Sequence, residues 1–158
     1  IMNKRSIKSI AAIAVAIVVL CGLSILIVAV QGYFTFLSPD KVGVLWSEDL
    51  KVIQTWVAGG RILGGASFFA LITAFLMKSI KGLKSGILFP AGNVPVLYLC
   101  ALAFFIYHFC QSNVGLLTGT EQNLLFDTDD LVISFIIVAF AMIYKVAVKV
   151  SEENSLTI

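Results

Sequence analysis

The stretch from Ile7 to Val30 reads IKSIAAIAVAIVVLCGLSILIVAV and has no charged side chain after Lys8. A helix needs about 20 predominantly apolar residues to cross the hydrocarbon core of a bilayer. The run is longer than the roughly 7–15 apolar residues of a signal peptide, and no small-x-small cleavage pattern follows it cleanly. It therefore predicts a retained membrane-spanning helix.

Three further segments have the same apolar character. They run from about Trp56 to Met77, from Val94 to Cys110 and from about Leu131 to Val148. Since a spanning segment must satisfy its backbone hydrogen bonds internally, we expect all four to be helices.

The composition agrees with a membrane protein. The chain is 59% hydrophobic and 13% charged, whereas soluble domains average about 45–50% and 25%. We expect an all-α protein, an integral membrane four-helix bundle that forms a single domain over residues 1–158, with a short tail at 151–158.

Polar residues mark the expected helix ends. Asn93 is expected to cap the third helix, with Pro95 in the first turn, where a missing N–H matters little. Asp127 and Asp129 suit the positive end of the dipole of the fourth helix. The sequence Ser47-Glu48-Asp49 predicts that the second helix begins near residue 48.

The basic residues predict the orientation, because lysine and arginine favour cytoplasmic loops. They gather before the first span, between the second and third spans and at the end of the fourth: Lys4, Arg5, Lys8, Lys78, Lys81, Lys84, Lys145 and Lys149. The opposite ends of the spans are mainly acidic: Asp40, Glu48, Asp49, Glu121, Asp127, Asp129 and Asp130. Both termini are therefore expected in the cytoplasm.

The second span contains the sequence GGRILGGA at residues 59–66. Gly60 and Gly64 form a G-x-x-x-G pair on one helical face, and small residues let helices approach closely in lipid. The pair is expected to pack within the monomer, and a contact with a second subunit stays open. Arg61 is expected in the outermost turn, where its guanidinium can reach the headgroups. The alternative is an arginine that lines a wet outer vestibule.

The sequence lacks the residue patterns of an active site, a metal centre or a cofactor site. His108 is the single histidine, and Cys21, Cys100 and Cys110 have neither metal-ligand nor disulfide spacing. The net charge of +2 has no basic patch of the size that nucleic acid requires. We therefore expect no enzymatic activity, no cofactor, no metal and no direct contact with nucleic acid.

Two of the expected cytoplasmic stretches resemble a known family. The second loop reads KGLKSGILF at residues 81–89 and leads to Asn93-Val94, and the chain ends EENSLTI at 152–158. With four spans at this spacing, they resemble the bacterial membrane family catalogued as domain of unknown function 2975, whose members are small four-span proteins. The chain departs from that family at Pro90-Ala91-Gly92, where the family carries a polar or basic stretch.

The resemblance implies a multi-pass protein of the bacterial cytoplasmic membrane with no established activity. Members are encoded beside small helix-turn-helix regulators, which implies membrane control of a transcription factor. We therefore expect a non-enzymatic protein that acts through protein contacts, as a membrane anchor or regulator of a cytoplasmic partner or as an accessory subunit of a membrane complex. The candidate contact residues are Gly86, Phe89, Asn93, Asn154, Leu156 and Thr157.

Two alternatives stay open. Residues 151–158 either add as a strand to the sheet edge of a partner or form a frayed end. For the whole chain, the alternative function is a small transporter or channel, monomeric or oligomeric. Arg61, Glu121 and the glycine-rich face would then line an outer vestibule.

Overall fold

The computed structural model describes residues 4–155, with the side chains of all but residues 4–7, 130 and 155. This part of the chain is helical and contains no strand. The long helices are α1 (Lys4–Leu37), α2 (Lys51–Lys84), α3 (Asn93–Ser112) and α5 (Thr128–Ser155). The short 3-10 helix η1 (Pro39–Val42) and the short helix α4 (Gly115–Thr118) lie in the connections.

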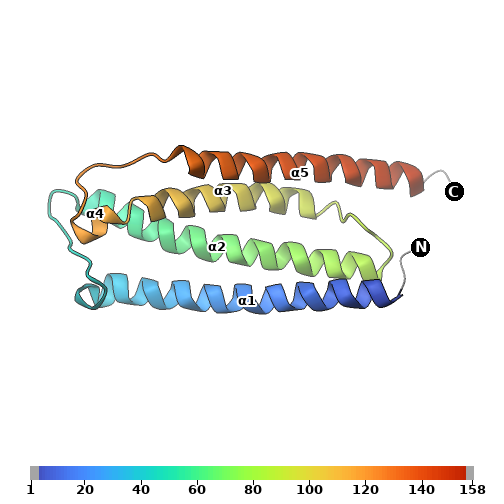
Figure 1. Cartoon of the computed structure of the whole chain (residues 1–158), viewed down its shortest axis with the longest axis horizontal. Coiled ribbons are helices and arrows are strands. Elements are labelled where there is room, and N and C mark those ends of the chain that lie inside the picture. Colours follow the sequence, from blue (N-terminus) through green and yellow to red (C-terminus); the bar gives the residue numbers. More distant parts are fainter. Residues whose placement is uncertain (1–3, 156–158) are drawn as a thin grey trace.

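The predicted all-α membrane architecture is confirmed at the level of the helices. Four helices in the described part are long and apolar enough to cross a membrane. They run alternately up and down the molecule, and the start of α1 and the end of α5 lie at the same end (Figure 1). We call this the terminal end, and the opposite end, which carries η1 and α4, the loop end.

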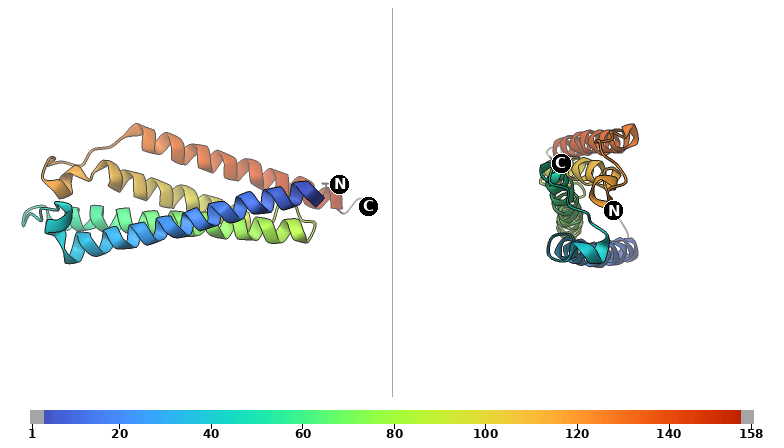
Figure 2. Two further views of the ribbon diagram at one scale, coloured as in Figure 1. Left: turned by 60° about the horizontal axis from the view of Figure 1, so that its bottom comes forward. Right: turned by 90° about the vertical axis from the view of Figure 1, so that its left-hand side faces the viewer.

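The long helices form an open row in chain order. α2 packs against α1 on one side and α3 on the other, and α5 packs against α3. α1 and α5 lie at opposite edges of the row, as the end-on view in Figure 2 shows. Each edge helix therefore buries one face against its neighbour and leaves a broad apolar face for lipid.

The buried face of α1 follows a seven-residue repeat. Ala14, Cys21, Val28 and Thr35 are each no more than 7% exposed. Seven residues bring a helix close to two full turns, so the four side chains form one seam along the helix. Small and β-branched side chains on this seam allow α1 to lie close to α2.

α2 and α3 make the closest approach in the row, and the G-x-x-x-G pair lies in their contact. A Cβ atom added to Gly64 would lie 2.8 Å from the backbone nitrogen of Tyr107, and one added to Gly60 would lie 2.5 Å from the Cys110 sulfur. The structure thus places both glycines against a helix of the same chain.

Two buried amides hold the loop end together. The Gln54 side chain is 1% exposed and donates to the carbonyl oxygens of Leu45 and Leu116, at 2.8 and 2.7 Å. The Asn113 side chain is fully buried, and it donates to the Leu125 carbonyl and accepts from the Leu125 N–H. The connections at this end are therefore tied to the helices by the hydrogen bonds of two buried side chains.

Two of the predicted helix starts are shifted. α2 begins at Lys51 rather than near residue 48, because the Ser47 N–H donates to the Gln54 side chain at 2.9 Å and residues 48–50 form a turn. The prediction that Asn93 caps α3 is wrong, since Gly92 occupies the cap position without a side-chain hydrogen bond. At α5, the Asp127 carboxylate does accept the Asp129 N–H at 3.0 Å, as a cap would.

The tail continues the last helix. Residues 151–155 belong to α5, whereas the two interpretations left open above are a strand added to a partner's sheet and a frayed end, and residues 156–158 lie outside the described part. Beyond the predicted end at Val148 the helix continues through mostly polar residues, among them the good helix formers Lys149, Glu152 and Glu153, and Lys149 and Glu153 form an i,i+4 ion pair at 3.8 Å.

Candidate functional site

The connection between α2 and α3, residues 85–92, forms a tight turn at the terminal end. Gly86 has a φ of +78°, a left-handed conformation that side chains other than glycine rarely adopt. The Ile87 N–H donates to the Gly82 carbonyl at 2.8 Å, and a Cβ atom on Gly82 would lie 2.5 Å from Pro90. The turn is therefore folded back onto the last turns of α2.

Asn93 joins three helices behind this turn. Its side chain is fully buried, and its amide nitrogen lies 2.8 Å from the Ser79 hydroxyl and 3.2 Å from the Tyr144 hydroxyl. Ser79 belongs to α2 and Tyr144 to α5, whereas Asn93 begins α3. A buried side chain cannot contact a partner, so the predicted contact role of Asn93 is replaced by a structural one.

Aromatic rings extend this contact. The Tyr144 ring meets Phe75 and Phe89 edge to face, with ring centroids 5.8 and 5.6 Å apart. Tyr144 also belongs to an apolar cluster with Leu97, Ala141 and Val148. Phe89 is thus held at a fixed place by α5, although it lies in a connection.

A groove of about 600 Å³ lies between this turn and α5, and we call it the α5 groove. Leu88 and Phe89 line it from the turn, and α5 contributes Ile143, Val146, Ala147, Val150, Ser151 and Asn154. Phe89 and Asn154, which the family resemblance predicts as contact residues, therefore face one groove from distant parts of the chain. Gly86 lies exposed in the same turn, and Leu156 and Thr157 fall outside the described part.

The terminal end carries mostly positive charge. Lys78 donates to the Gly92 carbonyl at 3.1 Å, and Lys149 lies 3.8 Å from the Glu153 carboxylate on the exposed side of α5. Lys81, Lys84 and Lys145 are exposed. The α5 groove thus combines an apolar lining with nearby lysines.

Sequence reasoning did not single out Ser79 or assign Tyr144 a structural role. A tyrosine near the end of a span is equally typical of the aromatic belt at a membrane interface. The only sequence signal for these two residues is that they are polar and lie close to helix ends. That signal does not show whether their side chains point into the protein or toward the membrane interface.

Arg61 and Glu121 lie near the loop end, each with a buried polar atom that has no partner among the described residues. These atoms are Nε of Arg61 and Oε2 of Glu121, and Oε1 of Gln111 is a third. Gly65 on α2 packs against Tyr107 on α3. Arg61 and Gln111 each lie one helical turn closer to the loop end than these two residues, so they are at a similar height along the long axis of the molecule. Neither Arg61 nor Glu121 lines the groove of about 1000 Å³ between α2 and α3.

No protein-family model, no curated protein and no solved structure matches the chain. The candidate site therefore rests on the geometry of the terminal end itself.

Proposed function

We propose that the chain is a non-enzymatic membrane protein that binds a protein partner at its terminal end. It would act as an anchor or regulator of a cytoplasmic protein, or as an accessory subunit of a membrane complex. This proposal includes the predicted orientation, with both termini in the cytoplasm of a bacterium, and the resemblance to the four-span family described above.

One observation carries the proposal. Leu88 and Phe89 in the turn and Asn154 on α5 belong to the two stretches that resemble the family, and they line the same groove, the α5 groove. Leu88 is 52% exposed and Val150 is 49% exposed, so apolar surface is available there. Well-packed apolar pockets inside a polar rim supply most of the binding energy at protein interfaces.

The groove is also preformed. Phe89 packs against Tyr144, and the buried Asn93 fixes α2, α3 and α5 relative to one another. A partner would therefore lose less free energy to ordering of this surface. The neighbouring lysines favour a partner segment that presents apolar side chains flanked by acidic ones.

The test compares two neighbouring substitutions in the turn. Leu88 and Ile87 are both 52% exposed, but only Leu88 lines the groove. After gentle extraction from native membranes, mass spectrometry should find a partner at fixed ratio with the natural protein and with Ile87→Asp. The amount of partner retained by Leu88→Asp should be at least about tenfold lower, since the loss of an interface hot spot weakens binding by about 2 kcal/mol or more.

Extraction of the natural protein alone, or equal retention by the two variants, would contradict the proposed contact. Deletion of Asn154 to Ile158 provides a second test, because it removes Asn154 from the lining of the groove together with the residues beyond it, and it should lower retention of the partner.

A transporter or channel is the second candidate. It is favoured by the unpartnered polar atoms of Arg61, Gln111 and Glu121 near the loop end. The groove of about 1000 Å³ between α2 and α3 has an almost wholly apolar lining, which does not provide a path for ions. Flux measurements on liposomes that contain the purified protein alone distinguish this function from the contact function.

A further inference from the structure

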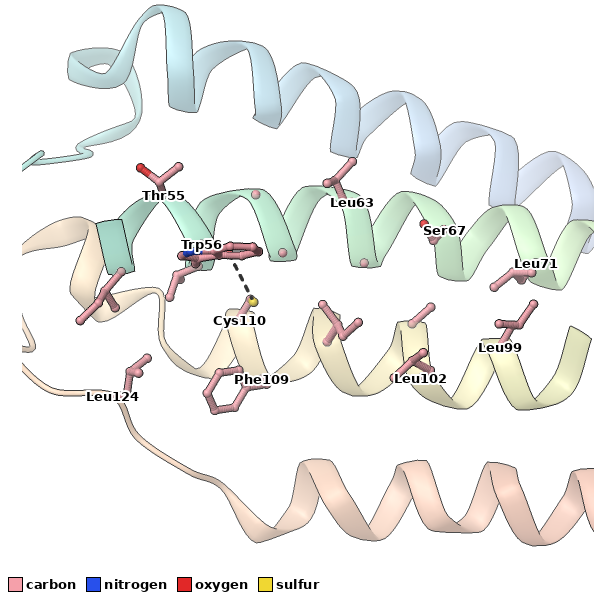
Figure 3. Close-up of a pocket in the computed structure, with 17 residues that line it drawn as sticks. Thr55, Trp56, Leu63, Ser67, Leu71, Leu99, Leu102, Phe109, Cys110 and Leu124 are labelled. Carbon is pink, nitrogen blue, oxygen red and sulfur yellow. Dashed lines mark hydrogen bonds between the residues drawn. The ribbon is translucent and has the colours of Figure 1, made fainter. Parts of the chain in front are cut away.

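The groove of about 1000 Å³ between α2 and α3, which we call the α2–α3 groove, extends along most of the spanning part of the chain. Its lining is almost wholly apolar, with Trp56 and Phe109 near the loop end and Leu71 and Leu99 deeper in the molecule (Figure 3). On α2 the lining runs from Ile53 to Leu71, about 27 Å at 1.5 Å per residue. This length is close to the roughly 30 Å of hydrocarbon that a spanning helix crosses.

The α2 side of the groove has a hollow and a projection one helical turn apart. The hollow lies at Gly59, where an added Cβ atom would meet no atom within 4 Å, whereas one added to Gly60 or Gly64 would collide with α3. The projection is Leu63, whose side chain is 69% exposed. Residues four positions apart lie on the same face of a helix, so the hollow and the projection face the same way.

Ser67 lies one more turn along this face, in the middle of α2, which runs from Lys51 to Lys84. It is exposed and lines the groove. Its hydroxyl group has no hydrogen-bond partner in the part of the chain that the structure describes. The hydroxyls of Ser24 and Thr73, in contrast, donate to the carbonyl four residues earlier, at 3.0 and 2.9 Å. A polar group without a partner is costly in hydrocarbon, so the occupant of the groove should supply one.

This hydroxyl distinguishes between the possible occupants of the groove. An acyl chain of a lipid can fill the hollow at Gly59, but it has no hydrogen-bonding group in the middle of the membrane. A spanning helix can bring such a group, and serine side chains do form hydrogen bonds between helices in membranes. Because a serine hydroxyl both donates and accepts, Ser67 of a second copy is a suitable partner for Ser67 of the first.

The same face is complementary to itself. In a two-fold pair both subunits present the same surface, and two copies inserted in the same orientation have parallel α2 helices. Side chains on a helix lean toward its N-terminal end. Leu63 of each copy therefore leans toward the level of Gly59, where the other copy has its hollow, while the two Ser67 residues meet at the same depth.

We propose that two copies of the chain form a parallel two-fold dimer through the α2–α3 groove. Leu63 of each copy fills the hollow at Gly59 of the other, and the two Ser67 hydroxyls form a hydrogen bond near the axis. This inference is independent of the proposed partner at the α5 groove, because the two grooves share no residue.

Disulfide cross-linking tests the geometry. Ser67→Cys changes one atom of the side chain and places a thiol near the proposed axis, and copper phenanthroline in native membranes oxidises two adjacent thiols to a disulfide. Gly22→Cys is the matched control, since Gly22 is exposed near the middle of α1 and an added Cβ atom meets nothing within 4 Å. The natural protein, whose Cys21, Cys100 and Cys110 are buried, gives the background.

We expect Ser67→Cys to give a covalent dimer and Gly22→Cys to give roughly tenfold less, because a lipid-facing position meets another copy only by collision. Cross-linking of Ser67→Cys that does not exceed that of Gly22→Cys would overturn the proposal.

A second measurement fills the hollow and weighs the intact complex. Gly59→Leu places a side chain in the open space without touching α3, and Gly22→Leu is its control. Native mass spectrometry in mild detergent should find a dimer of the natural protein and of Gly22→Leu. The dissociation constant should rise roughly tenfold in Gly59→Leu through overpacking. It should rise about threefold in Ser67→Ala, which loses one hydrogen bond between helices.

A dimer that Gly59→Leu leaves as stable as Gly22→Leu does would contradict the proposed contact. So would a monomeric natural protein that retains one phospholipid per chain and loses it in Gly59→Leu, since a lipid would then be the occupant.

Discussion

At the scale of single residues, three buried amides determine how the helix ends are held together. Gln54 and Asn113 tie down the loop end, and Asn93 joins α2, α3 and α5 at the terminal end. A hydrogen bond between spanning helices contributes only about 0.6 kcal/mol on average. A buried polar group left without a partner is more costly, about 1–3 kcal/mol. Removal of one of these amides therefore lowers stability mainly because it leaves the polar groups that it contacted without that hydrogen bond.

Replacement of Asn93 by alanine should destabilise the protein by about 1–3 kcal/mol. The change removes the N–H donor that the Ser79 and Tyr144 hydroxyl oxygens accept and leaves a cavity where three helices meet, although the two hydroxyl groups still donate to the Phe75 and Pro90 carbonyls. Unfolding in detergent, followed by circular dichroism, measures the difference. Asn123→Ala is the control, since Asn123 is exposed in a connection and its loss should change stability by less than about 0.5 kcal/mol. Equal effects of the two changes would contradict the structural role of Asn93.

At the scale of elements, the contact between α2 and α3 depends on where side chains are absent. Gly64 faces the backbone of α3, and Gly59, five positions earlier, faces open space. The two glycines look alike in sequence, but they have different roles. One allows two helices to touch, and the other borders a groove.

Alanine at these two positions should therefore have opposite effects. Gly64→Ala puts a methyl group 2.8 Å from the Tyr107 nitrogen. It should destabilise the protein by about 1–3 kcal/mol, because the backbones must move apart. Gly59→Ala meets no atom, so it should be neutral or add up to about 1 kcal/mol through helix propensity. Thermal unfolding of both variants in one detergent makes the comparison. A Gly64→Ala protein as stable as Gly59→Ala would show that the close approach is absent.

At the scale of the whole molecule, the open row of helices leaves most apolar side chains on the outside. Leu20 is 61% exposed, Leu63 69% and Ile143 66%, on three different helices. In water such a surface would drive association, because contiguous exposed apolar patches are rare on soluble proteins. In a bilayer the lipid chains cover it, so the row needs no closed core.

The orientation in the membrane is testable on the whole chain. Asp49→Cys should react with a membrane-impermeant maleimide in intact cells, and Ser85→Cys should react only after the membrane is opened. Both positions are exposed, at opposite ends of α2. The natural Cys21, Cys100 and Cys110 are buried, so they should add little background. The reverse pattern of labelling would contradict the assignment of the terminal end to the cytoplasm.

The sequence by itself determined the number of spanning helices and where each one approximately lies. Uninterrupted apolar length is a local property, and only a helix can satisfy its backbone within lipid. It also identified Phe89 and Asn154 as residues of interest, through a resemblance. It did not predict the extension of α1 to Leu37 or of α5 to Ser155, because a helix can continue through polar residues, here Gln31-Gly32 in α1 and the mostly polar residues 149–155 in α5.

Only the tertiary structure decided which face of each helix is buried. The helices are apolar on most sides, so the usual contrast between polar and apolar faces is missing. The buried face is instead the one whose small side chains let a neighbouring helix approach. Examples are the seam of α1 and Gly64, which lies against α3. The inward direction of Asn93 and the meeting of the turn with the end of α5 depend on contacts between distant segments. No local pattern contains that information.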